Sequence, residues 1–359
     1  MFKDFARNEK IVLAIVALGC LTLHLLVNLT GAYGFFRDEL YYIACSDHLA
    51  WGYVDQPPFS LLVLKISRLL FGDSLMAIRL TPVLMHTGTV VLTGLMVKEM
   101  GGKTFALLIA CLAVALSPIH LGMSLIFSMN SIDTFIWALS VYLILKLINT
   151  QNQSYWIWLG VVLGIGLMNK ISVLFLGSGI FVGFILTNRP WFATRWPYIA
   201  GVIVFILFSP YVLWNMANDY AHLEFIHNAS ASKYAGLSAM SFIKDQLLFL
   251  NPIATPLWLA GLLGLLFYSP LKKYRILAWI YLTAFAILIV NGTSKGEYLA
   301  PAYASLFAAA GVFAERKLTS NKVVWIKYAY LILILVTAIF LLPMILPVLS
   351  VDKYIAYSK

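Results

Sequence analysis

Long apolar stretches recur along the whole chain and constrain its fold more than any other feature. Cutting the sequence at charged residues and at Pro/Gly clusters leaves about eleven, each near the roughly 20 residues that cross a bilayer. Only 11% of the residues are charged, against roughly 25% in a soluble domain. We therefore predict an all-α polytopic membrane protein. The stretches are residues 11–30, 75–97, 104–122, 131–149, 155–169, 171–187, 197–216, 253–269, 274–291, 297–314 and 323–349.

Basic and acidic residues are distributed unevenly between the segments that join these stretches. If the N-terminus is cytoplasmic, the inside segments are short and rich in Lys and Arg, and eleven of the fifteen acidic residues lie near the outer face. Because basic residues collect in cytoplasmic loops, this split predicts an inner (plasma) membrane protein with the N-terminus inside. It also explains the net charge of +10 without nucleic-acid binding. The N-terminal inside segment holds Lys3, Asp4, Arg7, Glu9 and Lys10.

Two outer segments, residues 31–74 and 217–250, are long enough to hold structure. In the first we expect a short helix from Asp38 to Leu49 and an amphipathic helix from Phe59 to Leu70, separated by a break at Pro57–Pro58. We assign residues 1–349 to a transmembrane module and 350–359 to a short C-terminal tail. No internal repeat is evident, which weighs against many transporter folds.

The first outer segment concentrates ionisable residues in an otherwise apolar chain. Asp38 or Glu39 could act as a general base on an acceptor hydroxyl, or as a metal ligand. Asp55 precedes two prolines that would fix its direction, although it could instead cap the following helix. The other interpretation of the Arg37–Glu39 cluster is a charged membrane boundary. The same segment offers Tyr41 and His48 as further substrate contacts.

Asn130, Asp133 and Lys170 are polar candidates at the ends of predicted spans. Asn130 and Asp133 could join the outer site, or could simply cap and favour the positive end of their helix. Lys170 lies alone between apolar spans, where ionisable residues are usually functional, although its side chain could also reach outward to water.

Lys295, Glu297 and Tyr298 form a third outer cluster. Lys295 could bind phosphate, Glu297 could pair with it, and Tyr298 could stack on a sugar or donate a hydrogen bond. The alternative is a short interfacial hairpin. His222 and His227 are spaced too poorly on a helix for a convincing zinc site.

The remaining cysteines and histidines indicate no cofactor. Cys20, Cys45 and Cys111 make no metal or redox motif, and two of them lie inside predicted spans, where a small buried hydrophobe is expected. We expect His24, His86 and His120 to be packed or interfacial. No P-loop or dinucleotide fingerprint is present. A divalent cation held by Asp38, Glu39 and Asp55 remains the alternative to metal-independent chemistry.

Every acid-rich element maps to the outer face, which restricts the substrate. Nucleotide-sugars and ATP are cytoplasmic, so an outer-face enzyme needs a donor that has already crossed, such as a lipid-linked phosphate ester. The anionic head of that donor would need cations, and its chain would need a lipid-facing groove. The available cations are Arg37, Lys65, Arg68 and Lys295.

Several blocks occur in an order that resembles a known family. They are FRDELYYIACSDHLAWGYVDQPP, FGDSLMAIRLTPVL, NKISVLF, SPYVLWNMANDYAHLEF, LNPIATPLWLAGL and KGEYLAPAY. In this order they resemble the bacterial glycosyltransferase 39-like family of GT-C membrane enzymes. That family is similar to dolichyl-phosphate-mannose protein mannosyltransferases and to the aminoarabinose and galacturonic acid transferases of lipid A and lipopolysaccharide core.

The resemblance implies an inverting transferase that takes a sugar from a polyprenyl-phosphate donor without a metal. The acceptor would be an envelope glycan, lipid or protein. The family's catalytic base falls on Asp38, with Glu39 beside it, and its second acidic element falls on Asp55. Gln56 stands where aminoarabinose transferases have a Lys. Many relatives also carry a soluble outer domain after the last span, which we expect to be absent or truncated here.

One further departure and two alternatives complete the sequence-based hypotheses. The family often has Asp where this chain has Asn130, and Asp133, one turn on, is the expected substitute. A transporter or flippase for polyprenyl-linked sugars would use the same cations and apolar groove. A non-catalytic scaffold of an envelope-assembly complex is the third possibility.

Overall fold

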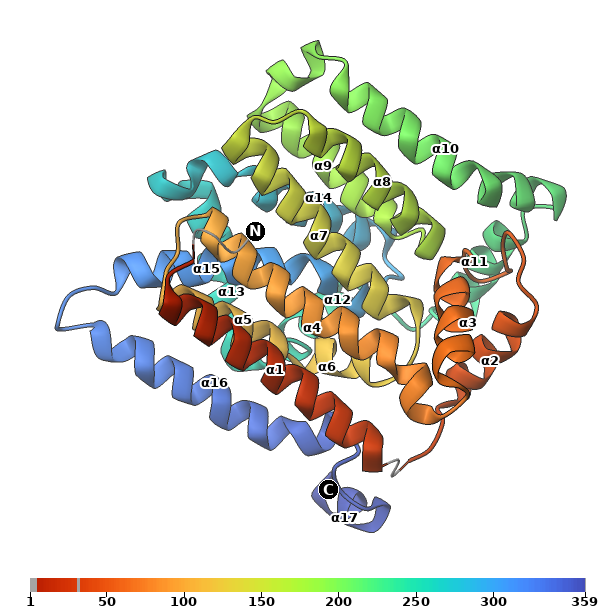
Figure 1. The fold of residues 1–359 in the computed structure, drawn as a ribbon, viewed down its shortest axis with the longest axis horizontal. Coiled ribbons are helices and arrows are strands. Elements are labelled where there is room, and N and C mark those ends of the chain that lie inside the picture. The colour runs from red at the N-terminus through yellow and green to blue at the C-terminus, as the bar shows by residue number, and fades with distance from the viewer. Residues whose placement is uncertain (1–4, 31–32, 359) are drawn as a thin grey trace.

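The computed structural model describes residues 5–30 and 33–358, and the regular elements in these ranges are all helical (Figure 1). Lys3 and Asp4 of the predicted inside segment lie outside the described residues. The α-helices are α1 (Arg7–Thr30), α2 (Arg37–Asp47), α3 (Phe59–Phe71), α4 (Leu75–Glu99), α5 (Thr104–Ala115), α6 (Pro118–Leu125), α7 (Met129–Thr150), α8 (Ser154–Asn169), α9 (Val173–Thr187), α10 (Trp196–Ala217), α11 (Ala221–Ala231), α12 (Ala239–Leu248), α13 (Thr255–Phe267), α14 (Ile276–Asn291), α15 (Tyr303–Lys317), α16 (Val324–Ile345) and α17 (Val351–Tyr357).

Each of the predicted apolar stretches contains one of these helices, which confirms a multi-pass helical membrane protein. Within the described ranges, α1, α4, α7, α10 and α16 are each long and apolar enough to cross a membrane. Two bent pairs, α5–α6 with 52° and α12–α13 with 92° between their parts, raise the total from five to seven. The helices α8, α9 and α14 are apolar but shorter. The eleven crossings predicted from the sequence therefore remain unconfirmed.

The centre of the bundle is built from α4, α5, α7, α13 and α15. Small residues let these helices approach closely. A Cβ added at Gly261 of α13 would lie 2.1 Å from the Leu306 carbonyl of α15. In contrast, only 17% of the most apolar window of α10 and 11% of that of α16 is buried inside the protein. These two helices therefore present apolar side chains to lipid.

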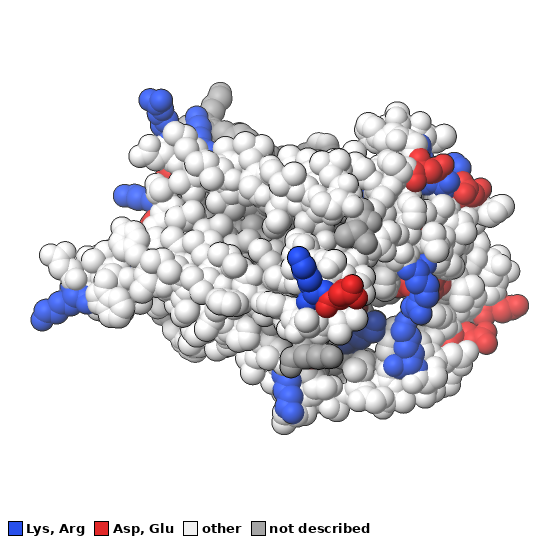
Figure 2. All heavy atoms as spheres, turned by 90° about the horizontal axis from the view of Figure 1, so that it is seen from below, with Lys and Arg blue, Asp and Glu red and all other residues white. Residues whose placement is uncertain are grey.

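Three helices of the two predicted outer segments, α2, α3 and α11, lie together at one end of the bundle, whereas α12 of the second segment is drawn nearer its middle (Figure 1). The two helices predicted in the first outer segment are confirmed as α2 and α3. In Figure 2 most visible acidic side chains lie toward this end, on the right, and Lys and Arg stand out at the opposite edge. The short tail after residue 349 holds α17, whose Tyr357 hydroxyl donates to the Phe340 carbonyl at 2.6 Å.

Candidate active site

Asp38 lies in the first turn of α2, with its side chain about half exposed at 48%. Its carboxylate accepts a hydrogen bond from Nε of Arg37 at 3.0 Å, and the Arg37 side chain is 82% exposed. The positive end of a helix favours a carboxylate at this place. Asp38 is therefore a solvent-accessible carboxyl group that an incoming hydroxyl could reach.

Glu39 has a different environment, although it is the next residue. Its side chain is fully buried, and its two oxygens accept Nε and Nη2 of Arg79 at 2.9 and 2.7 Å. The same carboxylate accepts the backbone N–H of Phe36 at 2.8 Å and that of Phe127 at 2.9 Å. A carboxylate with four donors has little capacity left for proton transfer. This geometry is that of a structural ion pair and speaks against Glu39 as a catalytic group.

Asp55 faces the aromatic side of α2. The Tyr41 hydroxyl donates to Asp55 Oδ1 at 2.7 Å. Burial raises the pKa of the Tyr41 phenol, and the bond to Asp55 raises that pKa further. Burial also raises the pKa of the Tyr42 phenol, and the negative charges of Asp55 and Asp38 add to that effect. Through Tyr41, Asp55 is bound to the helix that carries Asp38, so Asp38 and Asp55 belong to the same region.

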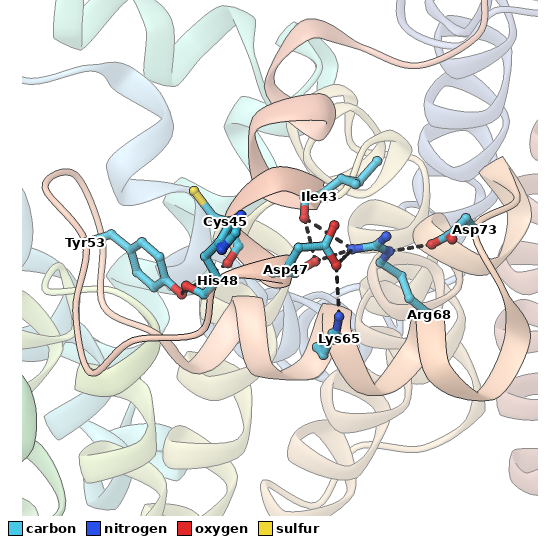
Figure 3. Close-up of polar contacts among 9 residues, drawn as sticks. Ile43, Cys45, Asp47, His48, Tyr53, Lys65, Arg68 and Asp73 are labelled. Atoms are coloured by element: carbon cyan, nitrogen blue, oxygen red, sulfur yellow. Dashed lines mark hydrogen bonds and ion pairs between the residues drawn. The ribbon is translucent and has the colours of Figure 1, made fainter.

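The cations of α3 point at the acids of α2 and of the loop after α3 (Figure 3). Lys65 Nζ lies 2.8 Å from Asp47 Oδ1, and Arg68 donates to the same oxygen at 2.9 Å. Arg68 also pairs with Asp73 and donates to the Ser46 hydroxyl at 2.7 Å. Hydrogen bonds from Lys65 and Arg68 lower the pKa of the Asp47 carboxyl. These contacts hold α3 against α2, so Lys65 and Arg68 are engaged before any phosphate binds.

His48 and Gln56 flank the turn between α2 and α3. The His48 side chain is exposed, and its carbonyl accepts the Tyr53 hydroxyl at 2.9 Å. Gln56 is fully buried, and neither atom of its side-chain amide has a hydrogen-bond partner in the described part of the chain. The buried hydroxyls of Ser60 and Tyr211 are unpartnered there as well. Gln56 therefore has spare donor and acceptor capacity.

A second cluster joins four of the candidates: Asn130 and Asp133 of α7, Lys170 between α8 and α9, and Tyr298 before α15. Lys170, between α8 and α9, is 8% exposed and donates to Asn130 Oδ1 at 2.8 Å. Its Nζ lies 3.6 Å from Asp133 Oδ2, which also accepts the Ser172 hydroxyl at 3.1 Å. The Lys170 ammonium lies 5.1 Å from the centre of the Tyr298 ring. Lys170 thus points inward to a polar cluster and does not extend outward to water.

Tyr234 extends this cluster toward Lys295. Its phenol interacts with that of Tyr298, and its ring centre lies 5.3 Å from the Lys295 ammonium. Lys295 Nζ lies 3.6 Å from Glu297 Oε1, which is the predicted pair. Lys170, Tyr298, Tyr234 and Lys295 therefore form a chain of neighbours that leads from a buried lysine to a more accessible one. Nothing in the sequence around Tyr234 distinguishes it, because its partners are some 60 residues away.

Met129 connects the second cluster to the first outer segment. Its carbonyl accepts the Asn169 side chain at 2.9 Å, and its backbone is also a hydrogen-bond partner of the Tyr42 phenol. The ring of Tyr42 packs against Phe127 with centroids 5.6 Å apart. The backbone around Phe127 and Met129, at the start of α7, therefore joins the region around Asp38 and Asp55 to the region around Lys170.

An apolar cavity of ≈ 250 Å³ opens beside the second cluster. The residues of α7 that line the cavity are close to Asp133 in the sequence, but the Asp133 side chain points to Lys170 and not into the cavity. The lining consists of Phe59 and Val63 of α3, Thr81 and Met85 of α4, Ile132, Phe135, Ile136 and Leu139 of α7, and Val162 and Ile165 of α8. A larger hollow of ≈ 770 Å³ lies at the other ends of α7 and α9 and holds none of the predicted site residues.

The whole arrangement is similar to solved membrane glycosyltransferases. The structure of ArnT from Cupriavidus metallidurans bound to undecaprenyl phosphate superposes with a TM-score of 0.68 at 17% identity, covering 98% of this chain and 76% of ArnT. The chain has the GT-C fold. The apo oligosaccharyltransferase of Archaeoglobus fulgidus matches this GT-C chain with a TM-score of 0.64 at 15% identity, over 94% of this chain and 55% of the oligosaccharyltransferase.

Sequence comparisons agree with the fold and confirm the resemblance. The family model for dolichyl-phosphate-mannose-protein mannosyltransferase matches residues 55–214 of the GT-C chain. The lipid A galacturonosyltransferase RgtD of Rhizobium johnstonii is 25% identical over 275 residues, which are 74% of this chain. The match spans 56% of the length of RgtD.

Proposed function

We propose that this chain is an inverting glycosyltransferase that moves a sugar from a polyprenyl-phosphate donor to an envelope glycan, lipid or protein. The observation that carries the proposal is the contrast between two adjacent carboxylates. Glu39 is buried in an ion pair, whereas Asp38 is half exposed at the start of α2. Only Asp38 is free to accept a proton from an incoming hydroxyl.

In the proposed reaction Asp38 removes the proton of the acceptor hydroxyl. The hydroxyl oxygen attacks the anomeric carbon and forms the new glycosidic bond. The bond between that carbon and the phosphate oxygen breaks, and its electron pair leaves with the polyprenyl phosphate. Attack opposite the leaving group inverts the anomeric configuration. Asp55, held by Tyr41 at 2.7 Å, is placed to orient the sugar or the acceptor.

The departing phosphate needs positive charge, and the best-placed source is Lys170. It is nearly buried, so its attraction for an anion is screened less than that of an exposed lysine. Lys295 and Arg37 are more accessible additional cations. Asn130, Asp133 and Tyr298 hold the Lys170 ammonium in place. The apolar cavity between α3, α4, α7 and α8 would take the first isoprene units of the donor.

Relatives and charge distribution support the class of donor and the side of the membrane. One of the solved relatives, ArnT, is bound to undecaprenyl phosphate. Most visible acids lie toward the end that holds α2, α3 and α11, whereas Lys and Arg predominate at the opposite edge (Figure 2). A cytoplasmic N-terminus and an outer-face site in the inner (plasma) membrane fit this distribution. The proposed reaction involves no metal or other cofactor.

The test is transfer by the purified full-length chain from a polyprenyl-phosphate-sugar panel to an envelope extract. Asp38→Asn should fold normally and lose at least about 100-fold in rate, the range for a general base. The matched control is Asp73→Asn, since Asp73 is an exposed acid of the same outer segment. Undiminished transfer by Asp38→Asn would remove the proposed base. A wild-type protein that moves the lipid across vesicles without forming product would support a flippase instead.

A further inference from the structure

A cluster of metal-binding side chains lies inside the bundle, on helices that the proposed reaction does not use. Cys20 and His24 are one turn apart on α1, and His86 faces them from α4. The exposed fractions of these residues are 4%, 0% and 2%. His24 Nε2 lies 2.9 Å from His86 Nδ1, and Cys20 Sγ lies 3.6 Å from the same nitrogen.

These three side chains converge as ligands of one ion do. The sulfur and one nitrogen from each ring all lie within 4.8 Å of one another. Metal–sulfur bonds of about 2.3 Å and metal–nitrogen bonds of about 2.0–2.1 Å place ligand atoms roughly 3–4 Å apart. A single ion at the centre of the group would therefore reach all three residues with little movement of α1 or α4.

The hydrogen bonds of His86 fix which nitrogen can act as a ligand. Its Nε2 lies 3.3 Å from the Val114 carbonyl, which can only accept, so Nε2 carries the proton. Nδ1 then has one lone pair, and both the Cys20 thiol and the His24 ring are directed at it. One lone pair cannot satisfy two donors well. A bound ion removes this conflict, and the Val114 bond supplies the outer partner typical of a metal-bound histidine.

Further polar atoms around the group also lack partners. His24 Nδ1, both nitrogens of His120 and the side-chain amide of Asn28 are buried without hydrogen-bond partners among residues 5–30 and 33–358. The His120 ring stacks on His86 with centroids 6.1 Å apart. A buried polar group without a hydrogen-bond partner is unfavourable, so several of them together within an apolar bundle indicate an occupant.

Charge indicates which ion fits. The groups placed against the cluster are the Val114 carbonyl, the Thr87 hydroxyl and the neutral His120 ring, none of which is charged. A thiolate, two neutral imidazoles and a monovalent ion sum to zero, whereas a divalent ion leaves one uncompensated charge in an apolar interior. Thiolate and imidazole together favour copper(I) or zinc. We propose that Cys20, His24 and His86 bind one copper(I) ion, which ties α1 to α4.

Metal content is the direct test. The full-length protein, expressed with copper and zinc in the medium and purified in detergent under reducing conditions, should contain about one copper per chain by mass spectrometry. Cys20→Ser and His86→Gln should each weaken copper binding about 10- to 100-fold. Cys111→Ser should keep the copper. Cys111 is equally buried in the bundle, but its thiol donates to the Val90 carbonyl at 3.5 Å.

A second measurement does not depend on the folding of the variants. Removing copper from the wild-type protein with a membrane-permeant chelator should lower its unfolding temperature, and adding copper(I) back should restore it. X-ray absorption should show a cuprous edge with sulfur and nitrogen ligands. A wild-type protein that neither contains nor binds a metal would overturn the site, as would equal copper in Cys20→Ser and Cys111→Ser. Zinc bound by the same residues in place of copper would overturn the charge argument and the choice of ion.

Discussion

Glu39 and Arg79 form a buried ion pair with two parallel hydrogen bonds, of 2.9 Å between Nε and Oε1 and 2.7 Å between Nη2 and Oε2. The pair joins the start of α2 to α4. The same carboxylate binds the backbone N–H of Phe127, just before α7. The Glu39 side chain thus holds together the start of α2, α4 and the segment before α7, which surround the proposed site. Asp38 is the residue next to Glu39 in the sequence.

We predict that the Glu39–Arg79 ion pair stabilises the folded protein and takes no direct part in sugar transfer. Glu39→Gln leaves Arg79 buried without a counter-charge and should destabilise the protein by about 3–5 kcal/mol. The double variant Glu39→Gln/Arg79→Met removes both charges and should cost less than the sum of the single changes. Thermal unfolding in detergent measures all of them. Arg37→Gln is the exposed control, expected to cost under about 1 kcal/mol, and additive effects of the two buried changes would contradict the prediction.

Lys170 is predicted to bind the phosphate of the donor. Lys170→Met should raise the KM for the donor about 10- to 100-fold, because a hydrogen bond to a charged group contributes about 1.5–3 kcal/mol. The single change also leaves the buried Asp133 unpaired, so stability should fall. Lys170→Met/Asp133→Asn should recover the stability but not the KM. Lys65→Met is the matched control, since Lys65 lies 2.8 Å from Asp47 whereas Lys170 lies 3.6 Å from Asp133, and an equal rise in KM there would argue against a specific role for Lys170.

Gln56 is predicted to serve substrate binding at a cost in stability. Its side-chain amide is buried and has no partner within the described ranges. Gln56→Met keeps the volume and removes that cost, so the unfolding free energy should rise by about 1 kcal/mol. If the amide contacts substrate, the same change should lower kcat/KM. Higher stability with unchanged kcat/KM would show that Gln56 has no part in binding.

His222 is predicted to make the outer segments sensitive to acid. Its ring lies against Tyr211, its Nδ1 lies 3.1 Å from the Val54 carbonyl, and burial lowers its pKa despite the nearby Asp55 charge. A lowered pKa in the folded state means that stability is present above the ordinary value of about 6.5 and is lost as the pH falls below it.

Unfolding temperatures measured between pH 7.5 and 5 would check this sign. His222→Gln should remove the part of the pH dependence that this residue causes. His227→Gln, on the exposed face of the same helix, should leave it unchanged. If His222→Gln and wild type lost stability in parallel on acidification, another group would be responsible.

The helical membrane fold could be predicted from the sequence because it depends on local patterns of residues. Apolar stretches mark the spans, and Pro57–Pro58 marks the break between α2 and α3. The number of crossings did not follow, because α5–α6 bends sharply within one predicted stretch, and α12, predicted in an outer segment, forms a sharply bent pair with α13. A bend depends on what packs against the helix, and composition does not record that.

Contacts between side chains that are far apart in the sequence were harder to predict from it. Arg79 was not singled out, since it lies inside a long apolar stretch and its partner is 40 residues away. The same distance separates Lys170 from Asn130. Lys65 was expected to be free for phosphate, but its bond to Asp47 depends on how α3 turns against α2. The identity of such residues is visible in the sequence, whereas their partners are set by packing.

Gly52 packs the segment between α2 and α3 against α10, one of the two least buried of the long apolar helices. A Cβ at Gly52 would lie 2.4 Å from the ring of Trp214 on α10, so backbone and indole are in direct contact. Only 17% of the apolar window of α10 is buried inside the protein. The segment that carries Asp55 therefore rests on a helix whose outer side is left to the surroundings of the protein, so one edge of the candidate site is supported by a single layer of helix.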